Sequence, residues 1–128
     1  MRQNHDGAVD LARAFATFDE PFAPRRVAHF DDSVVKIVKV HGEFVWHRHE
    51  DTDELFLVHA GTMEIRYRDR TVVLGPGQLH VVPRGVEHAT YATAPCLALI
   101  VERADTVNTG DAATGALTAH DEPFVTGA

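Results

Sequence analysis

Residues 42–61, Gly-Glu-Phe-Val-Trp-His-Arg-His-Glu-Asp-Thr-Asp-Glu-Leu-Phe-Leu-Val-His-Ala-Gly, hold the pattern that decides the fold: a His-x-His pair followed by a carboxylate. In an extended strand the side chains alternate between two faces, so His47 and His49 point the same way, about 6–7 Å apart. The acidic run 50–53 is expected to form a turn, because Asp and Thr bond their own backbone. Residues 54–58 have the composition of a strand. Folding this strand back on the first would bring Glu54 to the two histidines.

A second segment supplies a fourth candidate ligand. Residues 79–82 form a short β-rich run that ends at Pro83, and Gly85 permits a turn with positive φ. His88 opens the strand that follows. Three imidazoles and one carboxylate suit borderline first-row divalent metals, namely Fe, Mn, Ni, Cu or Zn.

The first segment resembles the first sequence motif of the cupin superfamily. That motif is Gly, five residues, His-x-His, three or four residues, Glu, six residues and Gly. The spacing agrees from His47 to Gly61, whereas Gly42 is followed by four residues rather than five.

The second segment resembles the second cupin motif, which is Gly, five residues, Pro-x-Gly, two residues, His, three residues and Asn. Ala92 stands where that Asn is expected, and the other positions match: Gly77, Pro83, Gly85 and His88. The resemblance covers residues 34–103. The chain looks like the small bacterial cupins loosely labelled mannose-6-phosphate-isomerase-like.

The resemblance implies an all-β fold, a cupin β-barrel of the jelly-roll (double-stranded β-helix) type with a short N-terminal helix. In cupins, the His, His, Glu and His positions of the two motifs bind a metal inside the barrel. Carried over, the metal ligands are His47, His49, Glu54 and His88. Asp53 lies on the opposite face of the strand from Glu54 and is the alternative ligand. The competing interpretation is that the nine histidines are surface residues of a half-polar β-protein.

The length of 128 residues predicts a single domain spanning 1–128. Residues 9–18 carry apolar side chains at helical spacing, with Asp10 placed as the N-cap. Strands separated by Gly, Pro and Asp turns indicate an antiparallel sandwich or jelly roll. One such break is expected at residues 94–95. The expected parts are an N-terminal helix and linker over 1–26, a barrel core over about 27–104, and a C-terminal arm over 105–128. Residues Pro123-Phe124-Val125 are expected to strap the arm across the barrel or across a partner.

Charge and cysteine content restrict the partners and the compartment. The net charge of −7 argues against nucleic acid and anionic membranes as partners. Cys96 is the single cysteine, which excludes an internal disulfide and fits a reducing compartment. No apolar stretch approaches the ~18 residues of a membrane span. We therefore expect a cytoplasmic protein whose partner is a small molecule.

Several side chains are assigned to faces by strand parity. Phe44 and Trp46 are expected on the outer face, opposite the histidines, where their apolar surface predicts a homodimer. Lys36 and Lys39 fall on opposite faces of one strand, and both ammonium groups are expected to reach water because a buried lysine is costly unless paired.

Four protein ligands would leave one or two metal positions open, which is typical of a working rather than a structural metal. Phe56 and Thr90 are expected in the cavity wall by parity with Glu54 and His88. Three functions stay open: a dioxygenase or oxidoreductase, an isomerase or lyase, and a non-catalytic or structural metal-binding module. We incline to an enzyme. The isomerase needs a proton acceptor, for which the candidates are Glu54, His80 and Tyr67.

Overall fold

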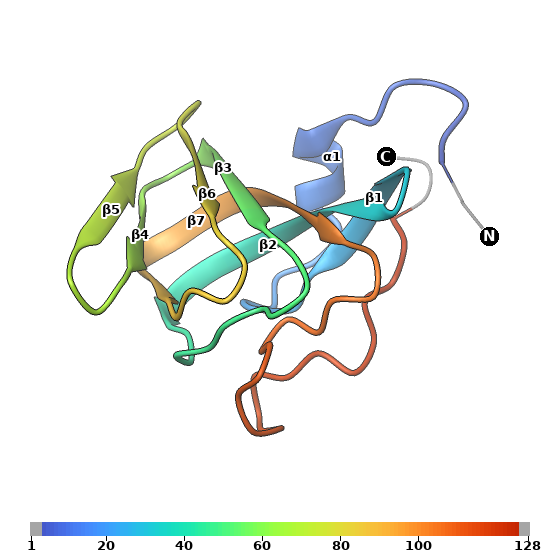
Figure 1. Cartoon of the computed structure of the whole chain (residues 1–128). Helices are drawn as coiled ribbons and strands as arrows, with labels where there is room; N and C mark the ends of the chain where they lie inside the picture. The colour runs from blue at the N-terminus through green and yellow to red at the C-terminus, as the bar shows by residue number, and fades with distance from the viewer. Residues whose placement is uncertain (1–3, 126–128) are drawn as a thin grey trace.

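The structure is a computed structural model that describes residues 4–125. Its longest strand is β7 (Ala89–Arg103), which pairs with three other strands. Seven strands form one sheet with the order β1-β2-β7-β3-β6, and β4 joins β7 and β5 (Figure 1). The other elements are α1 (Leu11–Phe15), β1 (Arg25–Phe30), β2 (Ser33–Glu43), β3 (Glu54–Ala60), β4 (Met63–Arg66), β5 (Thr71–Leu74) and β6 (Leu79–Val82).

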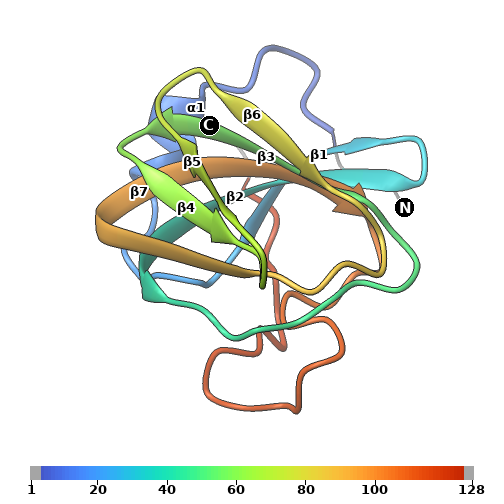
Figure 2. The same cartoon turned by 60° about the vertical axis from the view of Figure 1, so that its left-hand side comes forward.

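The pairing of β7 on both edges makes the sheet roll up. Strand β2 lies antiparallel to β7 along almost its whole length, whereas the other edge is shared by β4 at residues 89–91 and by β3 at residues 97–101. The strands therefore curve around a common apolar interior (Figure 2). This confirms the predicted all-β barrel.

The predicted break at residues 94–95 is wrong, because β7 runs through Pro95 without interruption. In the register of β2 and β7, Val40 pairs with Cys96 and Gly42 pairs with Ala92, so the intervening β7 residues have no partner on β2. A proline has no N–H to donate, and it is tolerated at such a bulge.

Helix α1 confirms the expected N-terminal helix but is shorter than residues 9–18. Asp10 is its N-cap, with Oδ1 accepting from the Arg13 amide at 3.1 Å. The buried side of the helix packs on the outside of β1 and β2 in a small apolar cluster with Val27, Ile37 and Val125. The expected helix and linker over 1–26 end earlier than predicted, since β1 begins at Arg25.

The prediction that Lys36 reaches water is wrong. Lys36 is 0% exposed, on the same side of β2 as the core residue Val38. Its ammonium lies 2.8 Å from Glu102 Oε2 and 2.7 Å from Glu122 Oε1. Arg26 also contacts Glu122, at 3.2 Å. These contacts supply the pairing that a buried charge requires. The sequence pattern did not indicate them, because Glu122 lies 86 positions after Lys36.

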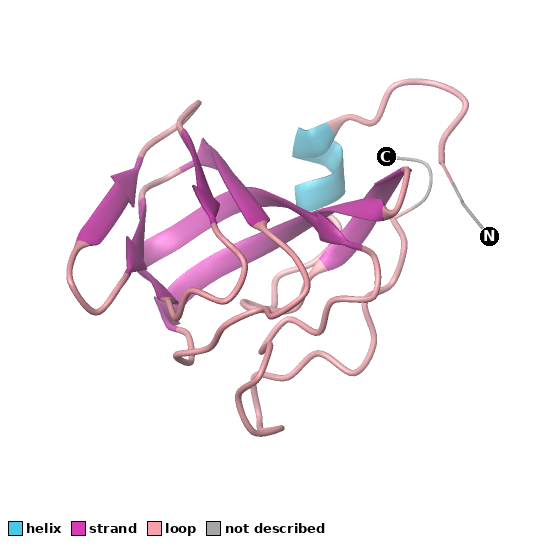
Figure 3. Ribbon diagram, viewed as in Figure 1, coloured by secondary structure: helices cyan, strands magenta, loops and turns pink. Residues whose placement is uncertain are grey.

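Lys39 lies on the opposite face, as predicted, and donates to the Phe18 carbonyl while remaining partly exposed. The predicted C-terminal strap is also confirmed. Arg26 donates from its amide to Pro123 at 2.9 Å and accepts from Val125 at 2.8 Å, forming a parallel bridge with Phe124. The rest of the arm runs as loop beside the barrel (Figure 3).

Cys96 is buried at a close approach between two segments of the chain. Gly61 has φ of +87°, and a Cβ there would lie 2.9 Å from the Pro95 carbonyl and 3.1 Å from Cys96 Cα. Burial raises the pKa of the Cys96 thiol to about 11. The thiol is therefore uncharged at neutral pH. Within residues 4–125, no helix is long and apolar enough to cross a membrane.

Replacing Lys36 by Met should destabilise the protein by about 3–5 kcal/mol, because Glu102 is left buried without a cation and Glu122 keeps only Arg26. The matched control is Lys39→Met, the same change on the opposite face of β2, for which we expect a loss of about 1 kcal/mol or less. Urea unfolding at pH 7 measures both. Similar small losses for the two variants would contradict a buried ion-pair cluster.

Candidate metal centre

Backbone hydrogen bonds bring the two histidine-bearing segments together. Residues 44–53 are irregular apart from one antiparallel bridge, in which His47 and His88 exchange two N–H···O bonds of 2.9 Å each. The amide of Gly85, whose φ is +77°, donates to the His49 carbonyl at 2.8 Å. Glu54, at the start of β3, faces the same point.

The imidazoles are oriented by carbonyls two residues earlier. His47 Nδ1 lies 2.9 Å from the Val45 oxygen, and His88 Nδ1 lies 3.0 Å from the Val86 oxygen. A ring that donates from Nδ1 keeps Nε2 as an acceptor or metal ligand. His88 Nε2 lies only 3.1 Å from Glu54 Oε1. Two acceptor atoms this close repel each other unless a proton or a cation lies between them.

The structure confirms that the four predicted side chains converge. Their candidate ligand atoms all lie within 4.8 Å of one another, and all four residues are buried: His47, His49, Glu54 and His88. His49 Nε2 is buried, lies 3.4 Å from Glu54 Oε1 and has no well-formed hydrogen bond among the described residues. A buried polar atom left unpaired is costly, and a metal ion would satisfy it. The donor set therefore fits a divalent transition metal.

Asp53, the alternative ligand, is not part of this group. Its Oδ1 accepts from the Arg84 amide at 2.9 Å on the surface. The acid instead ties the two segments together from outside.

Burial and mutual interaction set the charges of the centre. Burial lowers the pKa of His47 to about 4, assisted by the nearby charge of His88. Burial alone would raise the pKa of Glu54, but its interactions with His49 and His88 outweigh that effect and hold the pKa well below its usual range. At neutral pH the group therefore offers a carboxylate and an unprotonated His47, the forms that bind metals.

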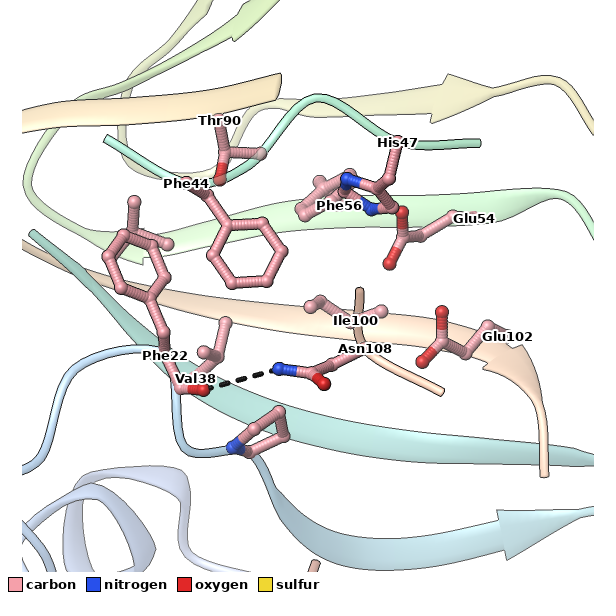
Figure 4. Close-up of a pocket in the computed structure, with 12 residues that line it drawn as sticks. Phe22, Val38, Phe44, His47, Glu54, Phe56, Thr90, Ile100, Glu102 and Asn108 are labelled. Carbon is pink, nitrogen blue, oxygen red and sulfur yellow. Dashed lines mark hydrogen bonds between the residues drawn. The ribbon is translucent and has the colours of Figure 1, made fainter. Parts of the chain in front are cut away.

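A cavity of about 40 Å³ lies beside His47 and Glu54 (Figure 4). It confirms the expected wall residues Phe56 and Thr90, and most of its lining is apolar. The full set is Phe22, Pro24, Val38, Val40, Phe44, His47, Glu54, Phe56, Thr90, Ile100, Glu102 and Asn108.

The prediction that Phe44 faces outward is wrong, since its ring lies in the cavity wall, 5.4 Å from the His47 ring. Strand β2 ends at Glu43, so side-chain alternation does not continue through the irregular segment after it. Trp46 is half-buried beneath the Arg68 guanidinium, 3.7 Å from the ring centroid. The apolar surface from which a homodimer was predicted is therefore largely covered within the chain.

Eight of the twelve cavity residues were not predicted from the sequence, and three of them, Glu102, Phe22 and Asn108, bear on the chemistry or the shape of the cavity. Glu102 follows Ile100 by two positions on β7, so strand parity could have identified it as a carboxylate facing inward. Phe22 and Asn108 lie outside regular elements, and no sequence pattern marks them.

Glu102 connects the cavity to the buried ion-pair cluster. Its Oε2 contacts Lys36, whereas its Oε1 is buried without a hydrogen-bond partner among residues 4–125. Burial and the charge of Glu54 raise the pKa of Glu102 well above its usual range.

Tyr67 and His80, the other candidate proton acceptors, lie together but outside the cavity lining. The Tyr67 hydroxyl and His80 Nε2 are 2.7 Å apart. Burial raises the pKa of Tyr67 and lowers that of His80. The structure thus separates this pair from the cavity beside the histidine group.

The C-terminal arm packs against the back of the loop that carries two of the histidines. Asp111 Oδ1 accepts from the Arg48 amide at 2.7 Å. A Cβ at Gly110 would lie 2.9 Å from His47 Cδ2, so glycine permits the close approach of the arm.

The fold and the site are those of a cupin. A family model described as a cupin domain matches residues 34–102, and the chain belongs to that family. The uncharacterized protein YdbB of Bacillus subtilis is 34% identical over 91 residues, covering 69% of this chain and 80% of the relative. A cupin-2 domain protein of Shewanella frigidimarina has a crystal structure with 42% identity and a TM-score of 0.73, covering 74% of this chain and 93% of that one. The DMSP lyase DddQ of Ruegeria pomeroyi is 26% identical with a TM-score of 0.52, over 66% of this chain and 42% of the lyase.

Replacing His47 and His49 together by Ala should reduce bound metal from about one ion per chain to less than about a tenth, since half the donors are lost. The barrel should stay folded, as circular dichroism will show. His41→Ala, at an exposed histidine, is the matched control and should keep its metal. Full metal content in the double variant, by elemental analysis, would refute the site.

The low pKa of His47 predicts acid sensitivity of the metal-free protein. The unfolded chain takes up this proton near pH 6.5 and the folded chain near pH 4, so stability falls as the pH drops through that window. The expected loss is about 3 kcal/mol between pH 7 and pH 4.

The variant His47→Gln should lack this component, so its loss between the two pH values should be smaller by that amount. The exposed control His41→Gln should behave like the wild type. Urea unfolding in the presence of a chelator measures the difference. Parallel losses in the wild type and His47→Gln would contradict the assignment.

Proposed function

We propose that this cupin binds one divalent first-row transition metal (Fe, Mn, Ni, Cu or Zn) through His47, His49, Glu54 and His88, and acts on a small metabolite. The observation that carries the proposal is the buried, incompletely paired donor group opening onto a cavity. Four protein donors leave one or two positions of an octahedral ion for a ligand.

The chemistry of the cavity limits the substrate class. The ionisable groups of the lining are His47, Glu54 and Glu102, and apart from Thr90 and Asn108 the rest of the wall is aromatic and aliphatic. Apolar walls with few polar groups suit a small ligand held by its polar end. We propose a compact substrate with a metal-binding oxygen group and a short apolar end.

Two reaction classes are supported. A bound metal would supply either a Lewis acid or, if redox-active, a centre for oxygen chemistry. Glu102 is a carboxyl at the cavity wall whose pKa is raised by burial and by the charge of Glu54, which favours proton transfer of the isomerase or lyase kind. The similarity to DMSP lyase DddQ is in line with a lyase. A dioxygenase or other oxidoreductase is the second candidate.

The alternative is a non-catalytic module that binds a metabolite, or a structural metal barrel. Its support is the small size of the cavity, about 40 Å³. The homodimer, the cytoplasmic location and the single domain over residues 1–128 remain our predictions. Sedimentation of the purified protein tests the first.

The decisive experiment loads the metal-free protein separately with Fe(II), Mn(II) and Zn(II) and offers each a panel of small hydroxy, oxo and thio acids. Turnover with Zn(II) as well as Fe(II) is expected for the isomerase or lyase. Oxygen consumption restricted to the Fe(II) protein would indicate the dioxygenase.

The variant with His47 and His49 changed to Ala is the control and should be inactive in every case. Binding of a panel compound without turnover by any metal form would favour the non-catalytic module. Failure of the wild type to bind any of the three metals would refute the proposal.

A further inference from the structure

The end of the cavity away from the histidines is built by parts of the chain outside the family match. The match covers residues 34–102. Phe22 and Pro24 come from the connection between α1 and β1, and Asn108 comes from the C-terminal arm. These flanking segments therefore complete a cavity whose donor group lies within the shared barrel.

Phe22 is held in an unusual backbone conformation. Its φ is +59°, in the left-handed region that bulky side chains rarely adopt. The Phe22 amide donates to the Lys39 carbonyl at 2.9 Å, and its carbonyl accepts from Asn108 Nδ2 at 3.4 Å (Figure 4). Strained conformations persist only where the surroundings fix them, and they cluster at functional sites.

Asn108 is itself firmly placed. Its Nδ2 also donates to the Leu117 carbonyl at 2.9 Å, and its Oδ1 accepts from the Ala119 amide at 2.7 Å. The arm thereby fixes Phe22 from one side, while β2 fixes it from the other through Lys39.

The Phe22 side chain is connected to the donor group through the ring of Phe44. Its ring lies 4.8 Å from the Phe44 ring, which in turn lies 5.4 Å from the His47 ring. Phe22 is only 9% exposed and belongs to the barrel core. A ligand that reaches inward from the His47 end therefore meets the two phenyl rings.

The remaining space is small. The cavity volume is about 40 Å³, which suits only a compact ligand. Removing the Phe22 ring would free space for a ring of the same size.

We infer that Phe22 is the specificity-determining residue of the cavity: held by Lys39 and Asn108, it restricts ligands to those with a metal-binding oxygen group and a short apolar end. This inference rests on the proposed metal site. It adds that the limit on ligand size is set by segments flanking the shared barrel rather than by the metal-binding residues.

The test compares two chelators that differ only in their apolar end, acetohydroxamate with a methyl group and benzohydroxamate with a phenyl group. Each is titrated into the Co(II)-loaded protein, and the visible absorption of Co(II) reports binding. The wild type should bind acetohydroxamate at least tenfold more tightly than benzohydroxamate.

The main variant is Phe22→Gly, because glycine removes the ring and adopts a positive φ without strain. Its affinity for benzohydroxamate should rise at least tenfold, with the affinity for acetohydroxamate changed less than threefold. Phe15→Ala is the matched control: Phe15 is also buried but packs outside the barrel with α1, so the wild-type preference should persist. Phe22→Leu, a milder truncation, should give a smaller gain and serves if the glycine variant does not fold.

The outcomes separate the two proposals. Failure of the wild type to bind Co(II) would refute the metal site. Normal Co(II) binding combined with equal affinity of the wild type for the two hydroxamates, with no binding of acetohydroxamate, or with no gain for benzohydroxamate in the Phe22 variants would overturn the role of Phe22 alone.

Discussion

Two backbone hydrogen bonds between His47 and His88 hold the site together. They join an irregular loop to the segment that enters β7, and the side chains of both residues then point at the same place as Glu54. The loop has almost no regular structure of its own, so its conformation depends on this bridge and on the contacts of Gly85 and Asp53. The geometry of the donor group is thus a property of the backbone pairing.

The fold and the donor group could be predicted because both depend on local spacing. The residues that converge at the site are fixed by short motifs, and the family match confirms the barrel. The errors have two physical causes. Lys36 is buried because Glu122 reaches it from a distant segment, the arm, whereas Phe44 turns inward because strand β2 ends just before it and the side-chain alternation stops there. Phe22 and Asn108 meet across 86 residues of sequence without any repeating pattern.

The terminal segments make the barrel of this chain distinctive. The arm is attached at one point by Glu122, which pairs with Lys36 and Arg26, and at another by Asp111, which binds the Arg48 backbone. The first attachment orients Glu102 at the cavity, and the second lies directly behind His47. Changes in the arm can therefore reach the site without altering any of its four donors.

The single cysteine gives the molecule a built-in reporter of opening. Cys96 lies beneath Gly61 in the middle of the rolled sheet, and burial keeps its thiol in the protonated form. Alkylating reagents attack the thiolate, so the closed barrel is inert to them and each opening exposes one reactive sulfur. The rate at which such a reagent modifies the protein then measures how often β7 separates from its neighbours, with and without metal, and without any label being introduced.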